Sequence, residues 1–145
     1  MDADLSKAIY KGFLAANMKI PTEGNIFVTL RDPDKNAATA KTLKRYEQAG
    51  FKLYASEGTG TFMKEAGIGA EVISYEQAKE MIGEEIKMVI NTPKVANRPE
   101  SDTFPIRRKA IERGLPVLTC LDTAAAFLIA INLKQKGVEL DYKVM

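Results

Sequence analysis

The 145-residue sequence contains no histidine and only one cysteine. Histidine is the usual general base near neutral pH, and Cys/His clusters hold many metals, so both kinds of site are disfavoured. The single cysteine, Cys120, excludes a disulfide within the chain and is typical of a reducing compartment. No apolar run approaches the roughly 20 residues of a membrane span, and "MDADLSKAIYKG" lacks the apolar segment of a signal peptide. We therefore expect a cytoplasmic protein.

The chain does contain enough apolar material for a core. Hydrophobic residues make up 46% of the sequence and charged residues 28%, over a length typical of one domain. The formal net charge is +2, whereas binding of duplex nucleic acid usually requires a strongly basic face. These values indicate an ordinary globular protein and do not favour nucleic acid as a partner.

Short β-forming runs alternate with helical patterns along the chain. Gly50, Gly67 and Gly114 each follow a helical pattern, as glycine commonly does at helix C-termini. Such alternation predicts an α/β three-layer sandwich, Rossmann-like, with a five-stranded parallel sheet and helices on both faces. The expected strands are Asn25–Leu30, Phe51–Ala55, Ala70–Tyr75, Ile86–Asn91 and Leu115–Cys120; the expected helices are residues 3–17, 34–50, 59–67, 76–84, 105–114 and 122–137, with a mobile loop at 92–104.

Polar residues collect where the predicted strands end, and ligands of open parallel sheets bind beyond these carboxyl ends. The stretch "ASEGTG", Ala55–Gly60, places two glycines at the start of a predicted helix, where backbone N–H groups can bind an anion. We therefore expect a phosphate site, with Lys35 or Arg31 supplying positive charge. The strand-end positions are Thr29 to Lys35, Ser56 to Thr59, Ser74 and Tyr75, Asn91 and Thr92, and Thr119 to Thr123.

Structural roles compete with this interpretation. The Gly-Thr turn could serve only as a helix cap through Thr59, because such turns open helices routinely. Lys35 alone could be a solvated residue at a helix start. Four other residues are expected to be structural: Arg107 and Arg108 on a solvated helix face, Asp122 as a helix cap, and Cys120 as a small buried residue.

Several stretches agree, in order and spacing, with one known family. They are "AIYKGFLAANMKIP" (Ala8–Pro21), "FVTLRDPDK" (Phe27–Lys35), "GFKLYASEGTGTFMKEAGI" (Gly50–Ile68), "VINT" (Val89–Thr92) and "IRRKAIERGLPVLTCLDTAAAF" (Ile106–Phe127). Through these stretches, which cover almost all of it, the chain resembles the methylglyoxal-synthase-like domain that closes the large subunit of carbamoyl phosphate synthase.

The resemblance implies a methylglyoxal-synthase-like fold and a regulatory domain without catalytic or metal-binding residues of its own. Domains of this family bind phosphorylated effectors such as UMP, UTP, IMP or phosphoribosyl pyrophosphate. Several members have a lysine near the position of Tyr75, and many have a hydroxyl or a Gly-Arg-Arg run where Pro93, Lys94 and later Arg98 stand here. Matched by position, the effector site comprises Thr29, Lys35, Ser56, Gly58, Thr59, Asn91 and Thr92, with Tyr75, Lys94 and Arg98 as further candidates.

The resemblance also implies a larger parent. Residues 1–23 would be the end of a preceding synthetase domain with a linker, and residues 24–145 the regulatory domain. The parent ligase makes carbamoyl phosphate from bicarbonate, glutamine-derived ammonia and ATP, for pyrimidine and arginine synthesis. ATP and Mg or Mn would be cofactors of the parent, with none in this domain. The other synthetase domains and a small glutaminase subunit would be its protein partners.

Two other functions compete. A free-standing methylglyoxal synthase, which acts on dihydroxyacetone phosphate, shares the fold but needs a histidine and aspartates. This chain has no histidine, and Thr92 precedes Pro93 where such enzymes carry an aspartate. An interaction domain without any ligand is the second alternative, and the hydroxyls, amide and lysine at the strand ends argue against it.

Overall fold

The computed structural model describes residues 23–92 and 104–135. The predicted helix at 3–17, most of the predicted loop at 92–104 and the boundary at residue 23/24 fall outside this range or at its edge, so these stay predictions. The elements are β1 (Asn25–Thr29), the 3-10 helix η1 (Asp32–Asp34), α2 (Ala37–Gln48), β2 (Lys52–Ala55), α3 (Glu57–Glu65), β3 (Ala70–Val72), α4 (Tyr75–Met81), β4 (Ile86–Asn91), α5 (Phe104–Glu112), β5 (Val117–Leu118) and α6 (Leu121–Gln135).

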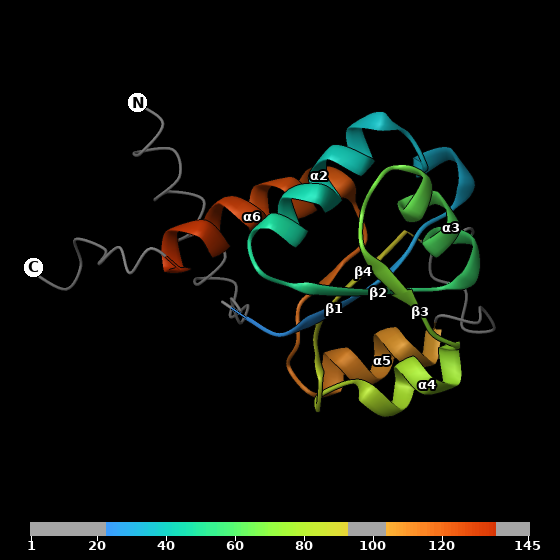
Figure 1. The fold of residues 1–145 in the computed structure, drawn as a ribbon. Coiled ribbons are helices and arrows are strands. Elements are labelled where there is room, and N and C mark those ends of the chain that lie inside the picture. Colours follow the sequence, from blue (N-terminus) through green and yellow to red (C-terminus); the bar gives the residue numbers. More distant parts are fainter. Residues whose placement is uncertain (1–22, 93–103, 136–145) are drawn as a thin grey trace, which may run out of the picture.

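The five strands form one parallel sheet in the order β3-β2-β1-β4-β5. Helices α2, α3 and α6 lie on one face and α4 and α5 on the other (Figure 1). This arrangement confirms the predicted three-layer sandwich. From β1 the chain moves first toward β2 and β3 and then returns to β4 and β5 on the other side. The reversal makes the β1–β4 junction a topological switch point, the usual ligand crevice of such sheets.

The strands are apolar on both faces, because helices cover each side of the sheet. Alternate residues serve different cores: Ile26 and Val28 belong to a cluster with residues of α2, α3 and α6, whereas Phe27 packs in a second cluster with residues of α4 and α5. Val89 of β4 also belongs to the second cluster. The side-chain direction of each strand-end residue follows from this alternation.

Helix α6 is apolar around most of its circumference, and it packs against both β5 and α2. The hydroxyl of Tyr46, in α2, donates a hydrogen bond to the carbonyl oxygen of Ala124 at 2.5 Å. Burial raises the pKa of Tyr46 well above its ordinary value. None of the helices in the described ranges is long and apolar enough to cross a membrane.

Two helix starts and the burial of Cys120 differ from the predictions. Helix α2 is capped by Asn36, whose Oδ1 accepts the N–H of Thr39 at 3.0 Å, whereas Asp34 ends η1. Helix α6 begins one residue earlier than predicted, so Asp122 lies in its first turn instead of at the cap. Cys120 is exposed, because β5 is only two residues long and Cys120 falls between strand and helix.

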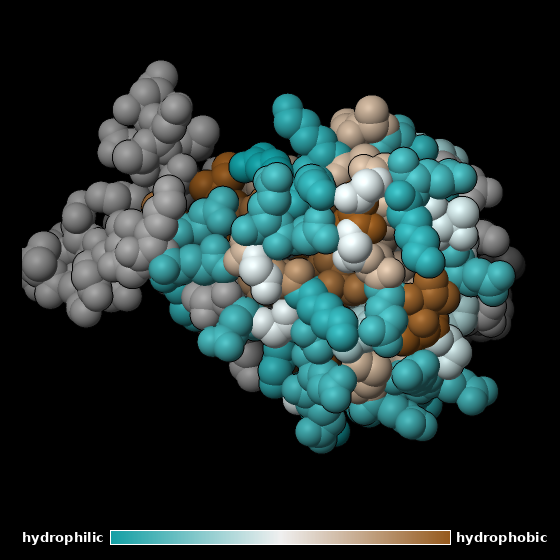
Figure 2. Space-filling view, in the orientation of Figure 1, coloured by the Kyte–Doolittle hydropathy of each residue, from teal (hydrophilic) through white to brown (hydrophobic). Residues whose placement is uncertain are grey.

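The surface is mostly hydrophilic on the face shown in Figure 2, with smaller apolar areas between the polar side chains. In the described ranges, the large apolar residues that are exposed are Val72, at 43%, and Ile111, at 66%. They lie on different elements, β3 and α5. The polar groups at the carboxyl ends of the strands are therefore a better indication of a functional site than these two separate apolar residues.

Candidate functional site

The structure brings most of the predicted site residues together at the carboxyl edge of the sheet. Thr29 ends β1 and is paired in register with Asn91, which ends β4. Val28 is paired with Ala55, so Ser56 follows β2 directly beside Thr29. The three strand ends are therefore adjacent, in the order β2, β1, β4, across the switch point.

Two buried threonines hold the chain that leaves β1. The Oγ1 of Thr59, a residue 1% exposed, accepts the N–H of Leu30 at 2.9 Å. The Oγ1 of Thr92 accepts the N–H of Arg31, also at 2.9 Å, while the Thr92 N–H donates to the Thr29 carbonyl at 3.1 Å. These bonds fix the loop that leads to Lys35, and they give both threonines a positioning role that sequence patterns did not indicate.

Hydroxyl groups form the floor of the site. The Ser56 Oγ lies 3.0 Å from Thr29 Oγ1 and 3.2 Å from Thr59 Oγ1, and its single hydrogen can serve either. The Tyr75 hydroxyl is 3.5 Å from Thr29 Oγ1. The ring of Tyr75 packs edge-on against Phe27, with centroids 6.3 Å apart. Tyr75, a further candidate from the sequence, thus lies within the same cluster as Ser56 and Thr29.

The N-terminus of α3 opens next to this floor. Its first i→i−4 bond runs from the Gly60 N–H to the Ser56 carbonyl at 2.7 Å. The N–H groups of residues 57–59 precede that bond and cannot find partners inside the helix. Ser56 occupies the cap position but makes no side-chain cap bond. Three backbone donors and the positive end of the helix dipole therefore face the strand ends.

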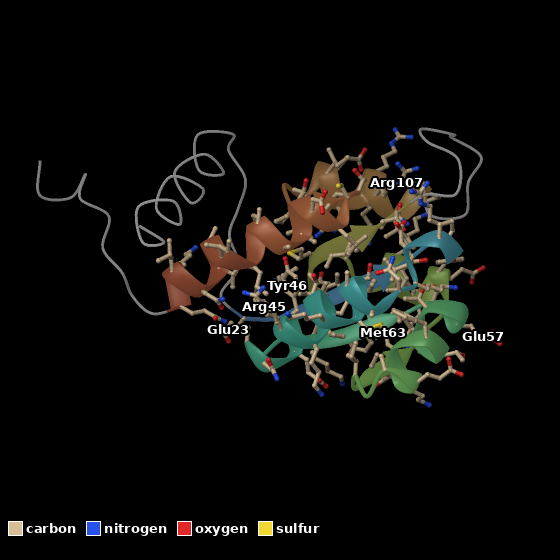
Figure 3. All side chains as sticks on the ribbon, turned by 90° about the horizontal axis from the view of Figure 1, so that it is seen from above. Glu23, Arg45, Tyr46, Glu57, Met63 and Arg107 are labelled. Atoms are coloured by element: carbon tan, nitrogen blue, oxygen red, sulfur yellow. The ribbon has the colours of Figure 1, made fainter. Side chains whose placement is uncertain are left out.

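Lys35 lies over this helix N-terminus. A β-carbon at Gly58 would be 3.2 Å from the Lys35 Nζ, so the ammonium approaches the helix where glycine leaves space. Glu57 is exposed and lies at the outer edge of the molecule in Figure 3. Arg31, the alternative cation, pairs with Asp34 at 2.7 Å. Lys35 is thus the predicted cation that the structure places against the α3 N-terminus.

Asn91 is 2% exposed, and its Oδ1 has no hydrogen-bond partner within the described residues. Along β4 its side chain follows the alternation of Val89, toward the face covered by α4 and α5. A buried acceptor without a partner is costly and marks a position where a ligand or water donor would be favourable. Lys94 and Arg98 lie outside the described residues.

The prediction for Arg107 is wrong. Its side chain is only 9% exposed, whereas Arg108 is exposed and pairs with Glu112 at 3.3 Å, as expected for a solvated face. Arg107 shares the inner side of α5 with Ala110, three residues further along, which belongs to the second core cluster. Charged residues are seldom buried, so composition gave little reason to expect it. The helical spacing to Ala110 is the signal that was available.

Comparison with known proteins places this geometry in a family. The family model of the MGS-like domain matches residues 38–119, more than half of the chain. The chain belongs to the MGS-like domain family. This match covers the β2–α3 turn, the hydroxyl floor after β2 and β3, and the end of β4. Only Thr29 and Lys35 of the described site residues precede it.

The MGS-like domain is also similar to a longer protein. The carbamoyl phosphate synthase large chain of Clostridium acetobutylicum is 40% identical over the whole chain, which spans 14% of that relative's length. Among solved structures, a dipicolinate synthase from Bacillus halodurans matches at 16% identity, covering 92% of this chain and 53% of that one, with a TM-score of 0.39. A transhydrogenase from Sinorhizobium meliloti has the same identity and TM-score, with coverage of 94% and 55%.

The polar groups at the strand ends of this MGS-like domain are chemically suited to hold an anion. Within the described ranges, no group of three or more acidic or cysteine side chains is placed to hold a metal ion. The groups at the strand ends are instead donors: backbone N–H groups, hydroxyls and an ammonium. Donors of this kind match the oxygens of a phosphate group.

Proposed function

We propose that this MGS-like domain is a regulatory domain that binds a small phosphorylated metabolite, with the phosphate at the N-terminus of α3. The observation that carries the proposal is that the Lys35 ammonium lies beside Gly58 in the first turn of α3, where Ser56 precedes the helix and the first-turn N–H groups lack partners inside it. Charge-assisted hydrogen bonds contribute roughly 1.5–3 kcal/mol each, so a few of them suffice for specific binding.

We further propose that the domain acts within the large subunit of a carbamoyl phosphate synthase, which is a ligase. The 40% identity to the large chain from C. acetobutylicum supports this assignment, and the family resemblance supplies UMP, UTP, IMP and phosphoribosyl pyrophosphate as effector candidates. Its partners would be the synthetase domains of the same large chain and, through the parent, the small glutaminase subunit in the cytoplasm. A coupling of roughly 1–3 kcal/mol between effector and synthetase domains would give useful regulation.

The competing activity is methylglyoxal synthesis from dihydroxyacetone phosphate. The absence of histidine argues against it, as does Thr92, whose hydroxyl accepts a backbone N–H at the position where those enzymes carry a carboxylate. Incubation with dihydroxyacetone phosphate discriminates between the two functions. An effector domain releases no phosphate above the buffer rate, whereas steady enzymatic release would establish the lyase.

Effector binding can be tested by the thermal shift of the isolated chain. A ligand at about 100 times its dissociation constant stabilises the folded state by roughly 2.7 kcal/mol, which is easily measured. We expect at least one of UMP, UTP, IMP and phosphoribosyl pyrophosphate to raise the melting temperature, and Lys35→Ala to reduce that rise.

The matched control is Lys41→Ala, since Lys41 is an exposed lysine of α2 and its loss changes the net charge equally. This control should respond to the ligands as the wild type does. An unchanged melting temperature with all four compounds would contradict the proposal and would favour an interaction domain without a ligand.

A further inference from the structure

Strand β3 forms one edge of the sheet, and none of the described strands pairs with its outer side. Figure 1 shows β3 at this edge, with α3 on one face and α4 on the other. The Ile73 N–H donates to the Ala55 carbonyl of β2 at 3.0 Å, and Ala55 is in register with Val72. Because successive strand residues direct their backbone groups to opposite sides, the N–H and carbonyl groups of Ala70 and Val72 point outward. The sheet therefore ends in an open row of backbone donors and acceptors.

The two faces of this edge differ in chemistry, because side chains alternate along the strand. Val72 lies toward α3 and contacts Gly60 so closely that a β-carbon there would collide with it. Val72 is also 43% exposed, so part of its apolar surface borders the open edge. Glu71 points to the opposite face, where its carboxylate is 3.4 Å from the Lys52 ammonium. A strand added to β3 would thus meet an apolar side chain on one face and a carboxylate on the other.

The groove on the α4 side of β3 is acidic. It has a volume of about 490 Å³, and four exposed glutamates contribute to its lining. A cation of the chain itself already lies at this surface, since the Lys52 ammonium is also 5.0 Å from the centroid of the Tyr54 ring. One ammonium offsets only one of the four carboxylates, so the groove is suited to further positive charge. The glutamates are Glu71, Glu80, Glu84 and Glu85, and Tyr54 and Met81 lie beside them.

A second copy of this chain does not fit the edge. Two β3 strands related by a two-fold axis would pair antiparallel, with both α4 helices on one face of the joined sheet. The acidic grooves of the two copies would then adjoin, and like charges at that distance repel. The segments 1–22, 93–103 and 136–145 do not match it either, because within each of them no two lysines or arginines are spaced two residues apart. That spacing places basic side chains on one face of a strand.

We propose that the open edge of β3 pairs with an extended segment of another polypeptide, one that carries lysine or arginine at alternate positions. The backbone of this segment continues the sheet beyond Ala70 and Val72, as in other recognition by strand addition. Its basic side chains point to the α4 side and lie against the glutamates, and its intervening side chains are small and apolar and lie beside Val72. This inference goes beyond the proposed function and does not depend on it, because β2 separates β3 from the switch point.

Fluorescence anisotropy with a labelled peptide tests the charge recognition. The probe alternates lysine with valine over about seven residues, the length of a strand, and a matched peptide has glutamate in place of lysine. We expect the 145-residue chain to bind the lysine peptide and not the glutamate peptide. Glu84→Gln combined with Glu85→Gln should weaken this binding roughly 2- to 30-fold, as loss of two exposed ion pairs does. Glu65→Gln combined with Glu112→Gln removes the same charge from α3 and α5 and should leave binding within about twofold of wild type.

Val72→Pro tests the backbone pairing. Proline removes the outward N–H and places its ring in the path of the added strand, whereas the bonds from β3 to β2 come from Glu71 and Ile73 and remain. We expect Val72→Pro to weaken binding of the lysine peptide by about 10-fold or more. Val72→Ala retains the N–H and should bind more tightly than Val72→Pro. Circular dichroism verifies the folding of each variant, and the glutamate variants decide the proposal where Val72→Pro fails to fold.

The contrary results are distinct. If wild type binds neither peptide, or binds both equally, the proposal is wrong, and the glutamates only keep the edge from pairing with other chains. If Glu84→Gln combined with Glu85→Gln binds as wild type does, the charge recognition is refuted. If Val72→Pro binds as tightly as Val72→Ala, the peptide does not extend the sheet, and the proposal is again wrong. The thermal shift with UMP should be the same for wild type and for the glutamate variants, so failure of the effector site is detected separately.

Discussion

The Thr59 hydroxyl offers the sharpest test of how the site is held together. Its Oγ1 accepts the N–H of Leu30, and both residues are buried, at 1% and 6% exposed. Thr59→Val preserves the branched shape but removes the acceptor. The Leu30 N–H is then left in an apolar environment without a partner, whereas in the unfolded chain water would bond it.

An unsatisfied buried N–H costs about 1–3 kcal/mol, so we expect Thr59→Val to lower the free energy of unfolding by about 2 kcal/mol. For a chain of this length that loss lowers the melting temperature by roughly 6–8 °C. Urea denaturation followed by circular dichroism gives the free energy directly. Thr59→Ser retains the hydroxyl and should recover most of the stability.

The matched control is Thr61→Val, two residues along the same helix. The Thr61 hydroxyl also makes a backbone hydrogen bond, to the Glu57 carbonyl at 3.1 Å, but the residue is exposed. Water can replace this bond, so the change should stay within about 0.5 kcal/mol. Equal stabilities for Thr59→Val and Thr61→Val would refute the claim that Thr59 fixes the loop after β1.

Three further predictions rest on single contacts. Gly58→Ala places a methyl carbon 3.2 Å from the ammonium over α3, so we expect weaker phosphate binding by calorimetry with nearly unchanged unfolding in urea. Tyr46→Phe removes the hydrogen bond to the Ala124 carbonyl and should cost about 1 kcal/mol in the same denaturation assay; no loss would contradict that bond. The hydrogen bond from the Gly69 N–H lowers the pKa of the Glu47 carboxyl in the folded state. The stabilisation from this bond is therefore complete above the pKa that Glu47 has in the unfolded chain, and it is lost as the pH falls through the pKa that Glu47 has in the folded chain. Urea midpoints between about pH 5 and 3 should therefore fall less steeply for Glu47→Gln than for wild type.

The layered fold could be predicted because its signals are local and repeated. Apolar β-forming runs separated by helical patterns specify a parallel sheet without any knowledge of tertiary contacts. Gly50, with a φ of 101°, ends α2 in a conformation that glycine adopts readily, and the sequence places it correctly. The site residues at the strand ends followed from the same reasoning, since the carboxyl edge of a parallel sheet is fixed once the strands are known.

The sequence could not reveal which hydrogen-bond partner each buried polar group has in the folded protein. Thr59 and Thr92 were expected to be ligand hydroxyls, but their oxygens accept the backbone N–H groups of Leu30 and Arg31. Thr59 is 29 residues from Leu30 in the chain, and Thr92 is 61 residues from Arg31, so no local sequence pattern relates the donor to the acceptor. The burial of Arg107 depends on the position of α5 against the sheet, and the helical spacing to Ala110 was its local signal in the sequence.

The cap of α3 shows how these contacts bear on function. A serine at this position ordinarily accepts a hydrogen bond from an N–H of the first turn, and losing such a cap costs about 1 kcal/mol. In α2 and α4, Asn36 and Ser74 do cap their helices in this way. Ser56 instead directs its hydroxyl toward Thr29 and Thr59, and leaves the first-turn N–H groups of α3 available. The helix that begins beside the switch point thus forgoes a local stabilisation that two other helices retain. A bound anion would restore it, because phosphate oxygens would accept the same N–H groups that the serine does not.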